Sequence, residues 1–121
     1  MKIFITEKDK EKLLLLIDEI ISSDIDGKDY VKKLEKELMI AQIVDRLPQD
    51  VVSMNSMVFL SIDNDEETVT LVYPENVDVS NNKISVLSPI GTAILGCRKG
   101  DTFDWEVNGQ ISHIEIKDVN N

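Results

Sequence analysis

The chain has 121 residues, of which 42% are hydrophobic, and this length and composition predict a small globular protein. Its longest apolar runs, such as Leu13–Ile17, are five residues long, whereas a membrane-spanning helix needs roughly 20 apolar residues. We therefore expect a cytoplasmic protein with no membrane partner. The single cysteine, Cys97, excludes an intramolecular disulfide and fits a reducing compartment.

Charge is unevenly distributed along the chain. The net charge is −10 at pH 7, and residues 1–48 carry 9 Lys or Arg and 11 Asp or Glu, whereas residues 49–121 carry 4 and 12. An acidic field repels phosphate backbones and attracts basic protein surfaces. We therefore expect no specific nucleic-acid binding and favour a positively charged protein partner. Solubility alone is the alternative explanation, because acidity by itself identifies no partner.

The first 48 residues predict two helices. Thr6 and Asp9 form an approximate capping box, and the apolar residues that follow at helical spacing predict a helix from about Glu7 to Ser22. A polar break with three aspartates and a glycine comes next. A second helix is expected from about Lys28 to Asp45, where spacings of three and four separate Val31, Leu34, Leu38 and Ala41. We expect the two helices to pack antiparallel and to end before Pro48.

Beyond Pro48 the apolar pattern changes to a period of two. It predicts a strand over Val51–Ile62, partly buried on both faces, in which one face carries Val52, Met54, Val58, Leu60 and Ile62 and the other carries Ser53, Asn55 and Ser61. A polar turn over 63–67 leads to a second strand that Pro74 closes. A loop over Asn76–Asn82 then precedes a third strand, Lys83–Leu87.

A short helix and a hairpin complete the predicted fold. Ser88 is a good N-cap, Pro89 suits the first helical position because the missing amide hydrogen costs nothing there, and Gly96 ends the helix. Strands Thr102–Val107 and Gln110–Asp118 flank an Asn-Gly pair, which is typical of a type I′ hairpin turn. The elements therefore predict an α+β protein whose sheet is antiparallel and carries one short helix.

The order of elements between Thr70 and Asp101, which is strand, loop, strand, Ser-Pro turn, short helix and Gly-Asp turn, resembles one family. It is similar to the carboxy-terminal domain shared by the Gre transcript-cleavage factors and Rnk, the so-called regulator of nucleoside diphosphate kinase. The segment LPQDVVSMNSMVFL (Leu47–Leu60) and the opening KIFITEKDKEKLLLLI resemble the Rnk version. The resemblance implies a short coiled coil, the antiparallel helical hairpin of residues 1–48, followed by an FKBP-like antiparallel sheet with one short helix in residues 49–121.

Residues that could perform chemistry are sparse. Strand alternation places His113 with Glu115 and Lys117 on the more polar face, so we expect an exposed strand residue. Cys97 directly follows Gly96, a position that often makes an apolar contact at a helix end, and we interpret it as structural. No glycine-rich phosphate-binding loop is present in the sequence. We therefore expect a protein that is not an enzyme and binds no cofactor or metal of its own.

Asp24, Asp26 and Asp29 lie where the hairpin is expected to turn. Gre factors place acidic residues at such a tip, pass it through the secondary channel of RNA polymerase, and help to hold the second catalytic magnesium. Hard oxygen ligands suit Mg²⁺. Helices of about 16 to 18 residues are only roughly 24 to 27 Å long, however, which is shorter than the Gre hairpin. A solvated turn is the alternative, because Asp bonds its own backbone in turns.

In the Gre family the carboxy-terminal domain docks on the rim of the secondary channel around its Ser-Pro turn. The residues that match here are Ser85, Leu87, Ser88, Pro89 and Ile90. The alternative explanation of Ser88 and Pro89 is that they simply make a good helix start.

The resemblance therefore implies a monomeric regulator that binds RNA polymerase at the secondary-channel rim and competes with longer channel-binding factors without catalysing a reaction. One alternative is a true cleavage factor, in which the tip aspartates deliver Mg²⁺ to the polymerase active site. A weaker alternative, a peptidyl-prolyl isomerase, rests on the FKBP-like fold alone.

Overall fold

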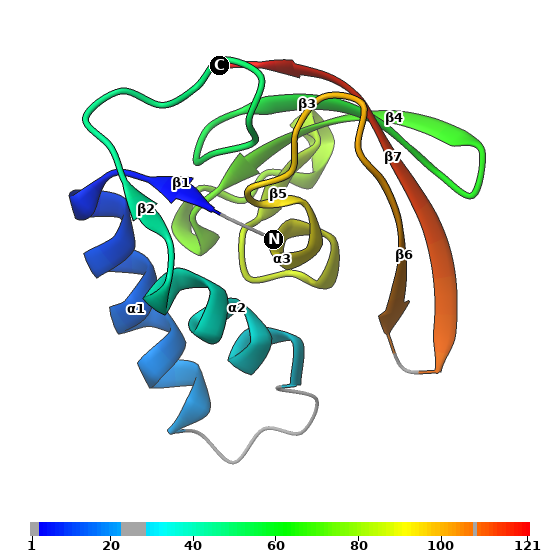
Figure 1. Ribbon diagram of the computed structural model, residues 1–121. Helices are drawn as coiled ribbons and strands as arrows, with labels where there is room; N and C mark the ends of the chain where they lie inside the picture. The colour runs from blue at the N-terminus through cyan, green and yellow to red at the C-terminus, as the bar shows by residue number, and fades with distance from the viewer. Residues whose placement is uncertain (1–2, 23–28, 108) are drawn as a thin grey trace.

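The computed structural model describes residues 3–22, 29–107 and 109–121, and at residues 29, 30 and 107 the description covers the backbone only (Figure 1). In chain order the elements are β1 (Phe4–Ile5), α1 (Glu7–Ile21), α2 (Asp29–Met39), β2 (Gln42–Ile43), β3 (Met57–Ile62), β4 (Asp65–Val72), the 3₁₀ helices η1 (Pro74–Asn76) and η2 (Val79–Asn81), β5 (Lys83–Ser85), α3 (Pro89–Ile94), β6 (Thr102–Val107) and β7 (Gln110–Asn120). The mixed α+β class is as predicted.

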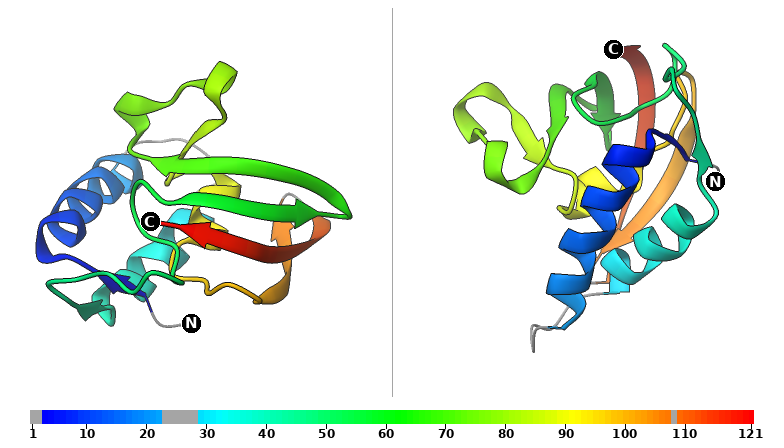
Figure 2. Two further views of the ribbon diagram at one scale, coloured as in Figure 1. Left: turned by 90° about the horizontal axis from the view of Figure 1, so that it is seen from above. Right: turned by 90° about the vertical axis from the view of Figure 1, so that its left-hand side faces the viewer.

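One sheet has the strand order β5–β4–β3–β7–β6. Its β4–β3, β3–β7 and β7–β6 pairs are antiparallel, as expected, but β5 pairs with β4 in parallel. The prediction of an entirely antiparallel sheet was therefore wrong at this edge. The chain leaves β4, passes through η1 and η2, and returns to start β5 in the same direction, and Figure 2 shows this segment projecting beyond the edge of the sheet.

The first part of the chain forms α1 and α2, which lie side by side (Figure 2). The Thr6 hydroxyl accepts a hydrogen bond from the Asp9 amide at 3.3 Å, so the predicted cap is confirmed, and α1 ends within one residue of the expected end. The prediction for α2 was wrong at its end, because the helix stops at Met39. The next residues pair with β1, where the Gln42 amide donates to the Ile3 carbonyl at 2.8 Å.

Residues 51–56 are a loop, so the strand predicted from Val51 was too long by six residues. Ser53 and Ser56 are buried here. Both hydroxyls hydrogen-bond to the side-chain oxygen of Asn121, whose side-chain nitrogen donates to the carbonyls of Pro48, Gln49 and Val51. Hydrogen bonding lets these serines be buried at little cost.

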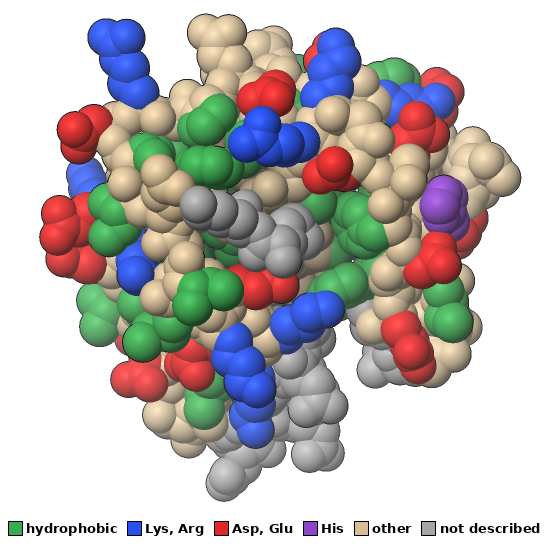
Figure 3. All heavy atoms as spheres, in the orientation of Figure 1, with side chains coloured by type: hydrophobic (Ala, Val, Ile, Leu, Met, Phe, Trp, Pro, Cys, Tyr) green, Lys and Arg blue, Asp and Glu red, His purple; other side chains and the backbone are tan. Residues whose placement is uncertain are grey.

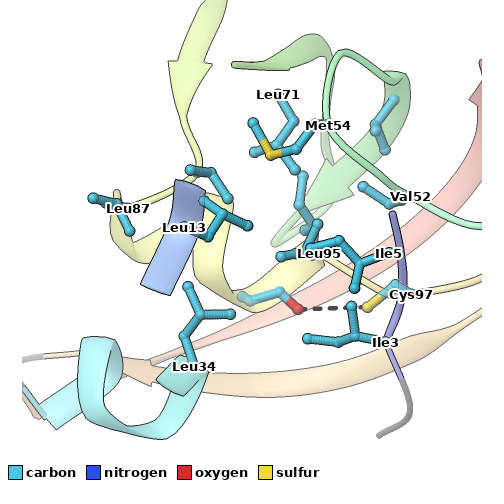
Figure 4. Packing of buried hydrophobic residues seen from close by; sticks show 14 of the residues in the cluster. Ile3, Ile5, Leu13, Leu34, Val52, Met54, Leu71, Leu87, Leu95 and Cys97 are labelled. Atoms are coloured by element: carbon cyan, nitrogen blue, oxygen red, sulfur yellow. Dashed lines mark hydrogen bonds between the residues drawn. The ribbon is translucent and has the colours of Figure 1, made fainter. Parts of the chain in front are cut away.

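One hydrophobic cluster joins the helices to the sheet. Figure 4 shows Ile3, Ile5, Leu13 and Leu34 from the first part of the chain packed against residues that follow Pro48, namely Val52, Met54, Leu71, Leu87, Leu95 and Cys97. Gly96 allows the loop after α3 to pack closely against Ile3, since a Cβ atom at residue 96 would lie 2.8 Å from Cγ1 of Ile3. In the described part of the chain no helix has the length and apolar character needed to cross a membrane.

Candidate functional site

The Ser-Pro turn is built by hydrogen bonds from its own serines. The Ser88 hydroxyl accepts from the Gly91 amide at 3.1 Å and donates to the Ser85 carbonyl at 2.7 Å. The Ser85 hydroxyl in turn accepts from the Leu87 amide at 3.0 Å. Ser88 is therefore the N-cap that the sequence predicted, with Pro89 in the first turn of α3. Both hydroxyls define the backbone between β5 and α3.

Gly91 allows α3 to approach the end of β5 at backbone distance. A Cβ atom at residue 91 would overlap the Ser85 carbonyl oxygen and lie 2.9 Å from Cα of Val86. No side chain larger than hydrogen fits there without displacing the helix. We did not single out Gly91 from the sequence, although a glycine inside a helix of six residues was a detectable signal.

A largely apolar groove of about 460 Å³ opens beside this turn. Residues from β3, β4, β5, the η1–η2 segment and the start of α3 line it: Ile62, Glu67, Val69, Val77, Val79, Asn82, Lys83, Ile84, Ser85, Ser88, Pro89 and Ile90. Four of the five predicted docking residues thus meet in one groove. The fifth, Leu87, is 7% exposed and packs in the core. We call the part formed by β5 and α3 the floor of the groove.

Residues 74–81, which contain η1 and η2, form the outer wall of the groove. Val77 is 43% exposed and Val79 is 83% exposed, so both present apolar surface to solvent. We expected only a loop here and missed both residues. The available signal was two valines within a segment of Asn, Asp and Ser, where a simple solvated loop has no need of them.

Polar contacts tie both ends of the outer wall to other elements. At one end Tyr73 donates its hydroxyl to Asp9 of α1 at 2.5 Å, and Glu75 pairs with Lys12 at 2.6 Å. At the other end Asp78 and Lys83 exchange backbone hydrogen bonds of 2.9 and 3.1 Å. Burial, together with the hydrogen bond to Asp9, raises the pKa of Tyr73 above its ordinary value.

The structure does not describe the side chains of the three aspartates expected at the hairpin tip. Asp24 and Asp26 lie outside the described residues, and Asp29 is the first residue of α2, with only its backbone described. Within residues 3–22, 29–107 and 109–121, no three His, Cys, Asp or Glu side chains are grouped so that they could hold a metal ion. The magnesium hypothesis therefore stays a prediction.

His113 and Cys97 have the positions that the sequence predicted. His113 is exposed on β7, its Nδ1 lies 2.9 Å from Asp104, and its neighbours Ile114 and Ile116 are buried. Cys97 is buried, and its thiol donates to the Ala93 carbonyl at 3.4 Å (Figure 4). Burial raises the pKa of Cys97 to about 12, so the thiol stays protonated at neutral pH.

Hydrophobic side chains also reach the surface of the helical part. In Figure 3 they gather over α1 and α2, between acidic and basic side chains. Leu15 is 69% exposed, Met39 65% and Ile40 74%. None of these residues lines the groove beside the Ser-Pro turn.

Relatives of this chain are transcription factors and a protein named as a regulator. The family model "Transcription elongation factor, GreA/GreB, C-term" matches residues 47–121. The regulator of nucleoside diphosphate kinase of Escherichia coli is 36% identical over 122 residues, which cover 97% of this chain and 88% of that protein. Transcription elongation factor GreA of Clostridium botulinum is 39% identical over 92 residues, 73% of this chain and 58% of the GreA chain.

Solved structures agree with this relationship. The prokaryotic transcription elongation factor GreA/GreB from Nitrosomonas europaea superposes with a TM-score of 0.79 at 36% identity, covering 100% of this chain and 99% of the other. Gfh1 of Thermus aquaticus, at 22% identity and a TM-score of 0.53 over 99% of both chains, shares the fold. The chain therefore belongs to the GreA/GreB family of transcription elongation factors.

Proposed function

We propose that the protein regulates transcription by docking on RNA polymerase, at the rim of the secondary channel, through the groove beside the Ser-Pro turn. The observation that carries the proposal is that Ser85, Ser88, Pro89 and Ile90, which match the docking region of the family, line one apolar groove. A concave apolar surface with a few polar groups is the usual form of a binding site. Glu67 and Lys83 supply charged groups to the lining and would orient a partner.

The proposal includes a division of roles between two parts of the chain. Residues 1–48 would form a short antiparallel hairpin, and residues 49–121 an FKBP-like domain that docks. Helix α1 has 15 residues and α2 has 11, which correspond to roughly 22 and 16 Å of helix. Such short helices favour a factor that occupies the channel and competes with longer factors, without bringing the tip to the polymerase active site. We propose that this factor acts as a monomer.

Isomerase activity finds no support in the groove. Among the residues that the structure describes, no aromatic side chain lines the groove, whereas ligand pockets are typically lined by hydrophobic and aromatic groups that enclose the bound molecule. We therefore retain only docking as the proposed function of the groove.

The test is retention of purified RNA polymerase on the immobilised 121-residue chain, repeated with a longer Gre factor as competitor. We expect retention that the competitor abolishes. Val79→Asp, which places a charge in the groove, should reduce retention. The matched control Ile111→Asp changes a residue of β7 that is 65% exposed and does not line the groove, and it should have no effect. Loss of retention with both variants, or with neither, would contradict docking through the groove.

A cleavage assay on backtracked RNA tests the absence of catalysis. We expect no cleavage above that of polymerase alone. Cleavage that disappears when Asp24, Asp26 and Asp29 are replaced together by asparagine, with polymerase binding kept, would instead establish a Gre-type cleavage factor.

A further inference from the structure

The outer wall of the groove is not held in place by a core of its own. Neither η1 nor η2 contains a buried residue. Val77 and Val79 are exposed, so the hydrophobic effect contributes little to fixing their position. Short-range hydrogen bonds shape the segment but do not attach it to the rest of the molecule. One example is the bond from the Asn76 amide to the Tyr73 carbonyl at 2.9 Å.

Attachment comes from the two ends of the wall. The end nearer β5 is held by the backbone hydrogen bonds between Asp78 and Lys83. The other end begins at Tyr73, a residue that is 7% exposed and whose hydroxyl donates to Asp9. The Tyr73 carbonyl accepts the first hydrogen bond of η1. A shift of Tyr73 would therefore also move the first residues of the wall.

Helix α1 presents the groups that hold this end. Asp9 and Lys12 are three residues apart and so lie on neighbouring turns of one helix face. Asp9 accepts the hydrogen bond from Tyr73, which is a strong type because the carboxylate is charged. Lys12 bonds Glu75 of η1 at 2.6 Å, and its ammonium group lies 4.0 Å from the centre of the Tyr73 ring. Glu75 of the wall and Tyr73, which directly precedes the wall, are thus attached to α1 across 63 and 64 residues of sequence, respectively.

We propose that Asp9 and Lys12 are positioning residues of the docking groove, through which helix α1 holds the outer wall in the shape that binds the partner. The inference rests on the proposed function for its meaning in docking, but the positioning itself can be measured without any partner. It assigns the helical part a role in the groove that is separate from any role of its tip.

The first experiment measures the position of the wall by NMR on the isotope-labelled full chain. Tyr73→Phe removes the hydroxyl and keeps the ring, so the core contact is retained. We expect shifts of the methyl resonances of Val77 and Val79. The control Lys99→Met breaks an exposed ion pair to Asp118 at 3.4 Å, away from the groove lining, and should leave these resonances in place. Unmoved Val77 and Val79 resonances in Tyr73→Phe would overturn the proposal.

A second variant series keeps the test valid if Tyr73→Phe folds poorly. Asp9→Ala removes the acceptor, whereas Asp9→Asn keeps an oxygen that can accept the hydrogen bond. We expect the methyl resonances of Val77 and Val79 to shift in Asp9→Ala, and to shift less from their positions in the unmodified chain in Asp9→Asn. Equal shifts in the two variants would contradict a role for the hydrogen bond. Lys12→Met should move them less, since exposed ion pairs are weak.

The second experiment measures polymerase binding by the same variants. Tyr73→Phe and Asp9→Ala should each weaken binding about tenfold, the size expected for a hydrogen bond to a charged group, and Lys99→Met should not. Because both variants remove the same hydrogen bond, the double variant should bind polymerase no more weakly than either single variant. Additive losses, or unchanged binding while the wall resonances move, would overturn the link between wall and docking. If the unmodified chain itself fails to bind, the proposed function falls, and the NMR series alone decides the positioning.

Discussion

The floor and the outer wall of one groove are built in opposite ways. The floor, at β5 and α3, is made by residues close in sequence. The Ser88 hydroxyl donates to the Ser85 carbonyl, the Ser85 hydroxyl accepts from the Leu87 amide, and Gly91 is packed where no Cβ fits. The wall has no buried residue in η1 or η2, and part of its support comes from α1. Residues close in sequence thus specify one side of this groove, whereas contacts with a distant helix help to specify the other.

The largest expected contrast is in thiol reactivity. Cys97 is buried just beyond α3 and burial raises its pKa to about 12, whereas a cysteine in place of the exposed Val79 would be accessible. Thiolate is the reactive form, so we expect native Cys97 to react at least ~1,000-fold more slowly than the Val79→Cys, Cys97→Ala variant. Labelling by a maleimide in native buffer measures the ratio. Comparable rates would show that the end of α3 opens as readily as the wall.

Gly91→Ala should be the most destabilising change to the floor. The added Cβ overlaps the Ser85 carbonyl oxygen, so α3 must move, and we expect a loss of about 3 kcal/mol in the free energy of unfolding. Gly100→Ala is the matched control, because residue 100 has open space and a φ of +94°. It should cost only about 1 kcal/mol from backbone strain. Denaturant unfolding compares the two, and equal losses would refute the packing argument.

Removing the cap of α3 should have a smaller effect. Ser88→Ala deletes the hydroxyl that accepts from Gly91, and N-cap removal typically costs about 1 kcal/mol. Ser80→Ala in the wall deletes an exposed hydroxyl bonded to Asp78 and should change stability by less than about 0.5 kcal/mol. Thermal unfolding of both variants checks the difference. A greater loss of stability in Ser80→Ala than in Ser88→Ala would contradict the view that the hydrogen bonds of the floor stabilise the fold more than those of the wall.

The smallest expected change in stability belongs to Val79, the more exposed of the two wall valines. Val79→Ser should alter the free energy of unfolding by less than about 0.5 kcal/mol, because Val79 is 83% exposed and loses few contacts. The same variant should bind polymerase more weakly if the groove is the docking site. A stability loss comparable with that of Gly91→Ala would mean that the wall is part of the folding core after all.

Most elements could be predicted because their signals are local. The caps at Thr6 and Ser88 and the strands that flank residues 108 and 109 were recognised from neighbouring residues alone. The end of α2 was not, because residues after Met39 continue an apolar helical pattern. Pairing with β1, nearly forty residues earlier in the chain, determines their conformation. The buried serines of the 51–56 loop were missed for the same reason, since their partner is Asn121.

The candidate site divides in the same way. Ser85, Ser88, Pro89 and Ile90 were predicted as docking residues and line the groove. Val77 and Val79 were missed: two valines in a polar segment were a visible signal, but no local pattern shows which groove they line. Asp9 and Lys12 could be placed on a helix from sequence. Their contacts with Tyr73 and Glu75 depend on how that helix packs, which residue spacing does not reveal.

The parallel pairing of β4 and β5 is the reason that the groove has a wall. Antiparallel neighbours can be joined by a tight turn, but parallel neighbours require the chain to travel back along their length before the second strand begins. The return path here is the η1–η2 segment. We therefore expect that its length and composition can change by insertion or deletion with little effect on the register of the sheet, so that such changes would widen, narrow or repolarise the groove and leave the floor as it is.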